Sequence, residues 1–267
     1  MPTPSIRAFT DDSVEPHVRG FLHQPDAPNG SALVLTHGAG SNAQAPLLVA
    51  LAETFSAAGF TVLRCDLPYR QTRSWGPPGP GDAARDRAGL KNAIAAIKTA
   101  GAPSLSRRSL AGQGGDIDSH PTTAPADFQQ SKHGDLKRWD KIFLGGHSYG
   151  GRQSSMLCAE LSEKEPDLVP AGLLLLSYPL HPPRKPEQQR TQHLPNLRTP
   201  SLFVHGARDP FGSIAELEQA LKMIPAKTKL VALEGAGHDL GFKGKARREE
   251  LPELILSEFS HFLDLSS

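Results

Sequence analysis

Ser148 lies in the stretch KIFLGGHSYGGRQ, where it forms a G-x-S-x-G pattern with Gly146 and Gly150. A chain with 25 glycines among 267 residues would contain about 0.2 such patterns by chance, so the pattern alone is weak evidence. Its context is more specific, because an apolar run that predicts a strand precedes it and a helix-forming segment follows it. A serine on such a tight turn is exposed to substrate, and glycines two residues before and after it avoid steric clash. Ser148 is therefore a candidate nucleophile, the alternative being a glycine-rich turn without chemistry.

A serine hydroxyl needs a base before it can attack a carbonyl, and His238 is the strongest candidate among the 11 histidines. It follows the last predicted strand, in the loop LEGAGHDLG. Asp209, in FVHGARDPFGS, follows the preceding strand and could orient the imidazole. Taken alone, a loop histidine is more often a solvated residue, and an Asp-Pro pair is more often a turn. Serine, aspartate and histidine in this chain order, each directly after a predicted strand, indicate a catalytic triad.

Acyl transfer through a serine also needs two donors for the oxyanion of the tetrahedral intermediate. The backbone N–H of Tyr149 is one candidate. The turn THGAGSN after the first buried strand offers the other, from Ala39, with Gly38 and Gly40 allowing close approach. A phosphate-cradling loop is the alternative interpretation, but HGAGSN lacks both the G-x-G-x-x-G register and the G-K-[ST] ending.

The elements that would position these residues alternate between short apolar runs and longer segments of helical period. This alternation predicts βα units around a mostly parallel sheet. Strands are predicted at 31–37, 60–66, 141–146, 171–179, 201–206 and 228–233, and helices at 45–59, 82–100, 152–161 and 213–224, with a further helix near the C-terminus. Because ligands of such sheets bind at the carboxyl ends of the strands, residues that follow strands are expected to meet at one edge.

Two segments interrupt the alternation within what we expect to be a single domain of residues 1–267. Residues 101–138 are rich in Ser, Gly, Pro and charge, and are predicted to be a disordered insertion. The insertion follows a helix and precedes a strand, so its ends belong at the amino edge of the sheet, where it is a poor active-site lid. Residues 180–200 follow a strand but contain no amphipathic helix of useful length, so a bulky lid is not expected there.

Composition argues against several classes of partner. With a net charge of +1, the chain has no broad field for nucleic acid or anionic lipid. Cys65 and Cys158 lie in apolar runs, as expected of buried thiols in a reducing compartment. No histidine pair has metal-ligand spacing, so neither a metal nor another cofactor is expected. The N-terminal residues include acids and no apolar core, and no apolar run approaches 18 residues, so we expect a cytoplasmic protein without a membrane anchor.

Several other residues near the candidate site have weaker claims to a role. His37 and His147 are expected to brace loops rather than to transfer protons. Arg152 is expected to contact the preceding loops or the segment 180–200. Four basic residues on carboxyl-edge loops could attract an acidic substrate but are expected to be solvated: Arg70, Arg184, Lys185 and Arg190.

The motifs LTHGAGSN, RCDLPYR, GGHSYGGR, LSYPLHPPRKPE, LRTPSLFVHGARDPFG and GAGHDLG together resemble the α/β-hydrolase superfamily. Within it they are most similar to a small dienelactone-hydrolase-like family, which includes testis-expressed protein thirty and the hydrolase-like region of a non-specific-lethal chromatin complex subunit. The resemblance runs from about Ser31 to the C-terminus, apart from 101–138. It implies an α/β-hydrolase fold, with a mostly parallel central sheet and helices on both faces, and a triad of Ser148, Asp209 and His238. Typical dienelactone hydrolases have cysteine where this chain has Ser148, which argues against dienelactone specificity.

The expected function is that of a serine hydrolase acting on a carboxylic ester or related small acyl compound through an acyl-enzyme. One alternative is a non-catalytic interaction module that keeps the fold and binds a protein through a surface such as the insertion. Another is an acyltransferase or peptidase with the same triad, because water or another acceptor can resolve the same acyl-enzyme.

Overall fold

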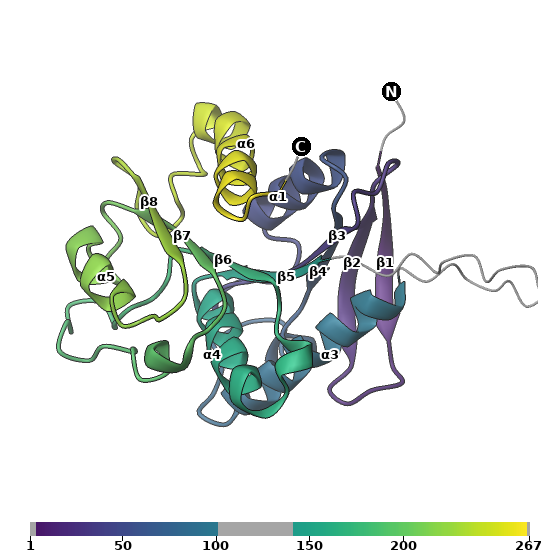
Figure 1. Cartoon of the computed structure of the whole chain (residues 1–267), viewed down its shortest axis with the longest axis horizontal. Coiled ribbons are helices and arrows are strands. Elements are labelled where there is room, and N and C mark those ends of the chain that lie inside the picture. Colours follow the sequence, from purple (N-terminus) through teal and green to yellow (C-terminus); the bar gives the residue numbers. More distant parts are fainter. Residues whose placement is uncertain (1–3, 101–140, 266–267) are drawn as a thin grey trace, which may run out of the picture.

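The computed structural model describes residues 4–100 and 141–265, so the insertion predicted at 101–138 lies outside the described residues. The described residues build an eight-stranded sheet with the order β1-β2-β4-β3-β5-β6-β7-β8 (Figure 1). Its strands are β1 (Ser5–Asp11), β2 (Val18–Gln24), β3 (Ser31–Thr36), β4 (Thr61–Cys65), β5 (Lys141–His147), β6 (Gly172–Leu176), β7 (Ser201–Gly206) and β8 (Thr228–Leu233). The helices are α1 (Pro46–Ala57), α2 (Pro68–Thr72), α3 (Asp82–Ala100), α4 (Tyr149–Lys164), α5 (Ile214–Leu221) and α6 (Lys245–Phe262), with short 3-10 helices η1 (Pro166–Leu168) and η2 (Leu194–Asn196).

The strands from β3 to β8 pair in parallel, whereas β1 and β2 pair antiparallel at one side of the sheet. The predicted α/β-hydrolase fold is confirmed, with a mostly parallel sheet between two layers of helices. Parallel strands end at the same edge, so the segments that follow β3, β5, β7 and β8 converge there. Lys141 begins β5 at the opposite edge of the sheet, away from the candidate site.

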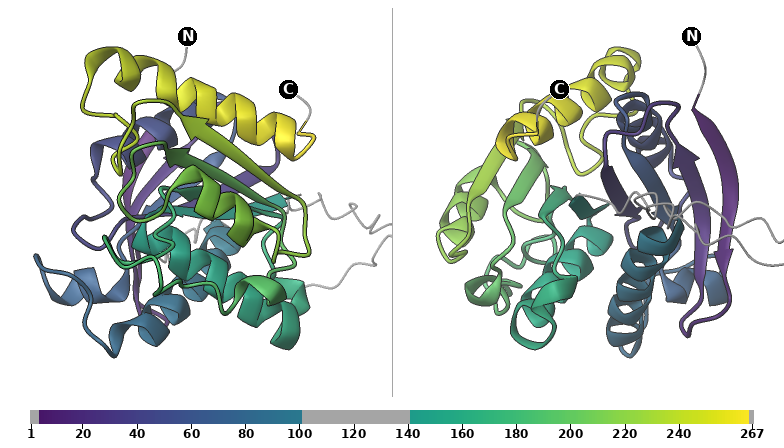
Figure 2. Two further views of the ribbon diagram at one scale, coloured as in Figure 1. Left: turned by 90° about the vertical axis from the view of Figure 1, so that its left-hand side faces the viewer. Right: turned by 45° about the vertical axis from the view of Figure 1, so that its right-hand side comes forward.

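Helices cover both faces of the sheet because its central strands are apolar on both sides (Figure 2). In β3, which is buried at every position, Leu33 and Leu35 pack toward α1 and α6, while Val34 packs on the side of α3 and α4. None of the helices in the described part of the chain combines the length and the apolar character needed to cross a membrane.

The structure also contains elements that the sequence pattern did not predict. Strand β1 is mostly exposed, so it lacks the apolar run by which the buried strands were recognised. Helix α2 has only five residues. Helix α4 begins at Tyr149 rather than Arg152, because Gly150 and Gly151 weaken the helical pattern but belong to its first turn.

Candidate active site

Ser148 occupies a strained turn between β5 and α4. Its φ of 52° and ψ of −117° lie where residues with a side chain are rare. Its backbone N–H donates to the carbonyl of Leu176 at 2.7 Å. A Cβ on Gly146 would lie 2.8 Å from the Gly151 nitrogen, and one on Gly150 would lie 2.5 Å from the His37 oxygen. The packing of the turn therefore requires both glycines of the motif, because any side chain at these positions would collide with backbone.

The structure brings Ser148, His238 and Asp209 into one hydrogen-bonded chain. His238 Nε2 lies 2.9 Å from Ser148 Oγ, and His238 Nδ1 lies 2.8 Å from Asp209 Oδ2. The Asp209 side chain is fully buried, while that of His238 is 26% exposed. A proton on Nδ1 that binds the carboxylate leaves Nε2 free to accept the serine proton, as a general base must.

Two adjacent loops hold Asp209 and His238 in register. The turn after β7 contains Asp209, and the loop after β8 contains His238. Arg208 N donates to Ala236 O at 2.8 Å across these loops. Gly206 allows this contact, because a Cβ there would lie 2.3 Å from the Gly237 oxygen. The second carboxylate oxygen, Asp209 Oδ1, accepts from Phe211 N at 2.9 Å and so fixes the carboxylate plane.

The turn of residues 38–41, which follows β3, lies directly against Ser148. A Cβ on Gly38 would lie 3.3 Å from Ser148 Cβ, so this glycine is needed for the close approach. A Cβ on Gly40 would meet nothing within 4 Å, and the prediction that Gly40 also allows close approach is wrong. Among the residues that the structure describes, neither Ala39 N–H nor Tyr149 N–H donates to another protein atom. Both donors are therefore available to an oxygen bound at Ser148.

His37 and His147 contact loop backbone, as expected of bracing residues. His37 Nδ1 lies 2.9 Å from Gly38 O, and its Nε2 accepts from Leu67 N at 3.1 Å. Burial lowers the pKa of His37. His147 Nε2 lies 2.8 Å from the carbonyl of His238. Neither imidazole is bonded to the Ser148 hydroxyl, whose histidine partner in the described structure is His238.

The arginines near the site differ in their surroundings. Arg184 and Lys185 are exposed, as predicted. Arg70 is only 7% exposed, so the expectation of a solvated position is wrong for this residue. Arg190 is half-buried, and burial followed by the charge of Arg152 lowers its pKa. The two guanidinium groups are thus near each other, while a contact of Arg152 with the preceding loops or with the segment 180–200 stays a prediction.

Three residues near the site were not identified from the sequence as site residues. The ring centroids of Phe211 and His238 lie 4.4 Å apart. Tyr69 and Asp86 are buried. The Tyr69 hydroxyl donates to Ala39 O, and the Asp86 carboxylate accepts from Tyr69 N and from the Tyr149 hydroxyl. Phe211 and Tyr69 stand inside motifs that mark the site, RDPFG and DLPYR, so their positions could have been suspected. Asp86 lies within a helix and has no local pattern that distinguishes it.

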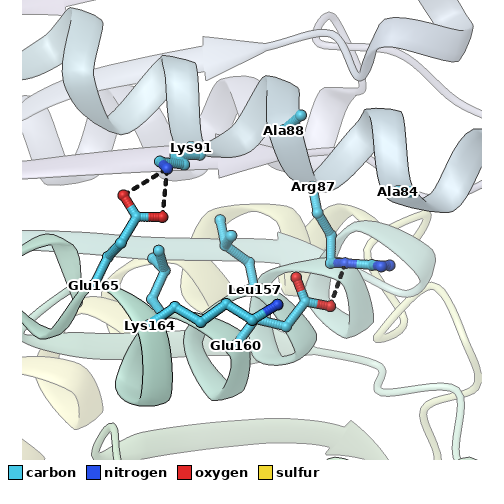
Figure 3. A pocket seen from close by; sticks show the side chains of 9 residues that line it. Ala84, Arg87, Ala88, Lys91, Leu157, Glu160, Lys164 and Glu165 are labelled. Carbon is cyan, nitrogen blue, oxygen red and sulfur yellow. Dashed lines mark hydrogen bonds and ion pairs between the residues drawn. The ribbon is translucent and has the colours of Figure 1, made fainter.

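A surface groove of about 230 Å³ lies between α3 and α4 (Figure 3). Two ion pairs cross it, Lys91 with Glu165 at 2.5 Å and Arg87 with Glu160 at 2.8 Å. Four of its five charged side chains are paired in this way, the fifth being Lys164, and no triad residue lines it. Within residues 4–100 and 141–265, no group of three His, Cys, Asp or Glu side chains is arranged to hold a metal ion.

A serine on a strained strand-to-helix turn, with an aspartate and a histidine after later strands of a mostly parallel sheet, defines the α/β-hydrolase class. The family model for an alpha/beta hydrolase domain matches residues 124–261, just over half of the 267 residues. The chain belongs to this alpha/beta hydrolase family.

Solved structures with the same fold include hydrolases from several bacteria. A dienelactone hydrolase from Anabaena variabilis is 20% identical with a TM-score of 0.64, over 97% of this chain and 99% of that one. Est1E from Butyrivibrio proteoclasticus is 15% identical with a TM-score of 0.61, over 96% and 99%. XC6422 from Xanthomonas campestris, described as a serine hydrolase without a lid, is 14% identical with a TM-score of 0.57, over 99% and 95%. At these identities the likeness concerns the fold.

Proposed function

We propose that this protein is a serine hydrolase that cleaves a carboxylic ester or related acyl compound through an acyl-enzyme on Ser148. The observation that carries the proposal is the unbroken chain from Ser148 Oγ to His238 Nε2 at 2.9 Å and from His238 Nδ1 to Asp209 Oδ2 at 2.8 Å. These are the contacts that a serine needs to lose its proton as it attacks a carbonyl.

In the proposed reaction, His238 accepts the Ser148 proton while Oγ attacks the acyl carbon. The Ala39 and Tyr149 N–H groups bind the oxyanion, and Asp209 stabilises the imidazolium. His238 then protonates the leaving alcohol, whose departure leaves an ester on Ser148. A water molecule, deprotonated by His238, attacks this ester and releases the acid. No step uses a cofactor.

The features of the site favour a small or soluble acyl substrate. The segment 180–200 lies at the carboxyl edge, and its described backbone contains the short 3-10 helix η2 but no long helix. We further propose that the chain belongs to the dienelactone-hydrolase-like branch that includes testis-expressed protein thirty and the non-specific-lethal complex subunit, on the motifs YPLHPP and RDPFG. Both cysteines are free and buried, which supports the expectation of a reducing, cytoplasmic setting.

Labelling with a fluorophosphonate probe tests the nucleophile. Wild type should be labelled, and Ser148→Ala should not. Ser154→Ala is a matched control, because Ser154 is a buried serine of α4 whose hydroxyl donates to Gly150 O at 2.9 Å. Unlabelled but folded wild type would contradict the proposal, and so would labelling that survives in Ser148→Ala. Hydrolysis of p-nitrophenyl acetate should fall by roughly 10⁴ to 10⁶ in Ser148→Ala.

A further inference from the structure

Three buried side chains hold the carbonyl groups of the 38–41 turn. His37 Nδ1 lies 2.9 Å from Gly38 O. The Tyr69 hydroxyl lies 2.8 Å from Ala39 O and 3.3 Å from Gly38 O. Arg70 donates from Nη2 to Ala39 O at 3.0 Å and from Nε to Ser41 O at 2.7 Å. The side chain that precedes the turn and two side chains of α2 thus fix the path of this turn.

These contacts set the direction in which the Ala39 N–H points. In a trans peptide the C=O and the N–H point in opposite directions, so the position of Gly38 O determines where the Ala39 N–H is aimed. Gly38 O is held by His37 and by Ser41 N at 3.0 Å. The following peptide is held through Ala39 O by Tyr69 and Arg70. Ala39 is therefore fixed on both sides, with its N–H left without a protein acceptor among the described residues.

Arg70 contributes a charge as well as geometry. It is 7% exposed, and its guanidinium also donates to Arg73 O at 3.1 Å and Gly76 O at 2.8 Å. Its hydrogen-bond acceptors among the described residues are all backbone carbonyls, its guanidinium also lies over the Tyr69 ring at 5.0 Å, and no described carboxylate forms an ion pair with it. The guanidinium therefore keeps its positive charge close to the turn, where it favours the negative oxygen of a tetrahedral intermediate.

Asp86 links this arrangement to the second oxyanion donor. The buried carboxylate accepts from Tyr69 N at 3.1 Å through Oδ1 and from the Tyr149 hydroxyl at 2.8 Å through Oδ2. The rings of Tyr69 and Tyr149 also pack edge to face, with centroids 6.0 Å apart. The Asp86 carboxylate therefore binds both Tyr69, whose hydroxyl holds Ala39 O, and Tyr149, whose backbone N–H is the second candidate donor.

We propose that Tyr69 and Arg70 are positioning residues that aim the Ala39 N–H at the oxyanion, and that Asp86 couples them to Tyr149. The role rests on the proposed function, since an oxyanion forms only if Ser148 attacks a carbonyl. None of the three touches the reacting atoms; they act through the backbone of the turn and, for Arg70, through its charge. Losing them lowers kcat more than it raises KM, because the oxyanion contact strengthens in the transition state.

The test compares Tyr69→Phe, Arg70→Gln and Arg70→Lys with a matched control, Tyr178→Phe. Tyr178 is 1% exposed, and its hydroxyl donates to Arg190 O at 3.3 Å, so its loss removes a similar buried bond elsewhere. Hydrogen exchange at the amides of residues 39–41 reports the order of the turn without needing any activity. It should be faster in Tyr69→Phe and Arg70→Gln than in wild type or Tyr178→Phe.

Kinetics with p-nitrophenyl acetate test the consequence. We expect kcat to fall by about 10- to 100-fold in Tyr69→Phe and Arg70→Gln, with KM within about two-fold, since complete loss of one oxyanion donor costs about 10² to 10³. Arg70→Lys, which keeps the charge but not the fork of donors, should lie between Arg70→Gln and wild type.

The failures are distinguishable. An inactive wild type that a fluorophosphonate does not label overturns the proposed function, and with it the catalytic role of Tyr69, Arg70 and Asp86, whatever the exchange data. With an active wild type, unchanged exchange in Tyr69→Phe and Arg70→Gln overturns the positioning role. The positioning role is also overturned if kcat in Tyr69→Phe and Arg70→Gln stays at the wild-type value, or if kcat falls equally in Tyr178→Phe.

Discussion

His147 and His238 are joined through the backbone: Nε2 of His147 donates to the carbonyl oxygen of His238 at 2.8 Å. The residue directly before the candidate nucleophile thus supports the loop that carries the candidate base. His147 makes this bond as a neutral imidazole, because burial lowers its pKa to about 4. Its Nδ1 would lie 2.9 Å from a Cβ on Gly38, so the same ring also packs against the oxyanion turn.

Removing this support should misplace the base. In His147→Ala, the loop of His238 loses its donor, and we expect kcat for p-nitrophenyl acetate to fall by about 10- to 100-fold, because small displacements of catalytic groups are costly. His147→Gln, whose amide can donate to the same carbonyl, should recover part of the loss. His193→Ala serves as the control, since His193 is a half-buried histidine that bonds to Ser155 rather than to either catalytic loop. Equal activity in wild type and His147→Ala would contradict this role.

The carboxylate of Asp209 should fix the tautomer of His238 in which Nδ1 carries the proton and Nε2 is free to accept one. Asp209→Asn keeps the shape of the side chain, but an amide does not stabilise the imidazolium. We expect kcat to fall by about 10⁴, as for triads of this kind. Asp239→Asn, one residue beyond His238, changes a 42%-exposed carboxylate and should leave kcat within about two-fold. Comparable losses in the two variants would mean that net charge, rather than the triad, governs the rate.

The glycines around the site should differ sharply in their tolerance of alanine. Gly150→Ala would place a Cβ 2.5 Å from the carbonyl oxygen of His37, a contact that must displace backbone. We expect either loss of fluorophosphonate labelling or a clearly lower Tm, since overpacking costs about 1–3 kcal/mol. Gly40→Ala meets nothing within 4 Å and should be labelled and melt like wild type. Normal labelling and stability in Gly150→Ala would show that the turn relaxes easily.

The sequence predicted the central sheet because strands such as β3 and β6 are apolar at nearly every position, and only burial on both faces produces such runs. It did not predict β1, whose pairing with β2 satisfies its backbone while its side chains stay in solvent. An edge strand of this kind is specified by a partner elsewhere in the chain, so local periodicity does not reveal it.

The candidate triad could be predicted for a similar reason. Its three members each follow a strand, and strand ends are fixed by the apolar runs before them. The contacts of Arg70 and Asp86 could not be predicted in this way, because their partners are backbone groups 31 and 17 residues away. An arginine bound to carbonyl groups and an arginine in water have the same local sequence pattern, and only the tertiary structure separates them.

The two cysteines should be unreactive in the folded protein. Both Cys65 and Cys158 are buried, and burial raises the pKa of each thiol to about 12. The thiolate is the reactive form, so a colorimetric disulfide reagent at pH 8 should find no accessible thiol in the native state. In denaturant the same reagent should detect both cysteines of the chain. Rapid reaction of native protein would contradict the buried positions of these side chains.

Acid should destabilise the fold through three of its histidines. Burial lowers the pKa of His23, His147 and His193 to about 4. In the unfolded chain a histidine takes up its proton near pH 6.5, so between pH 6.5 and 4 the unfolded state binds more protons than the folded state. The free energy of unfolding is therefore fully retained above pH 6.5 and falls as the pH is lowered toward 4, by up to about 1.4 kcal/mol per pH unit for each such histidine.

Unfolding in urea at pH 7.5, 6.5 and 5.5 measures this slope, and one variant isolates a single histidine. His23 accepts from Arg64 Nε at 2.8 Å through Nε2, a contact that the amide oxygen of a glutamine can replace. His23→Gln should therefore lose less stability than wild type between pH 6.5 and 5.5. Glu15 and Glu216 do not account for the effect, because their pKa values are lowered below 4.5, through hydrogen bonds with Arg85 and Ser213 respectively, and they titrate in more acidic solution. An unfolding midpoint that stays constant from pH 7.5 to 5.5 would show that these histidines take up protons in the folded protein as they do in the unfolded chain.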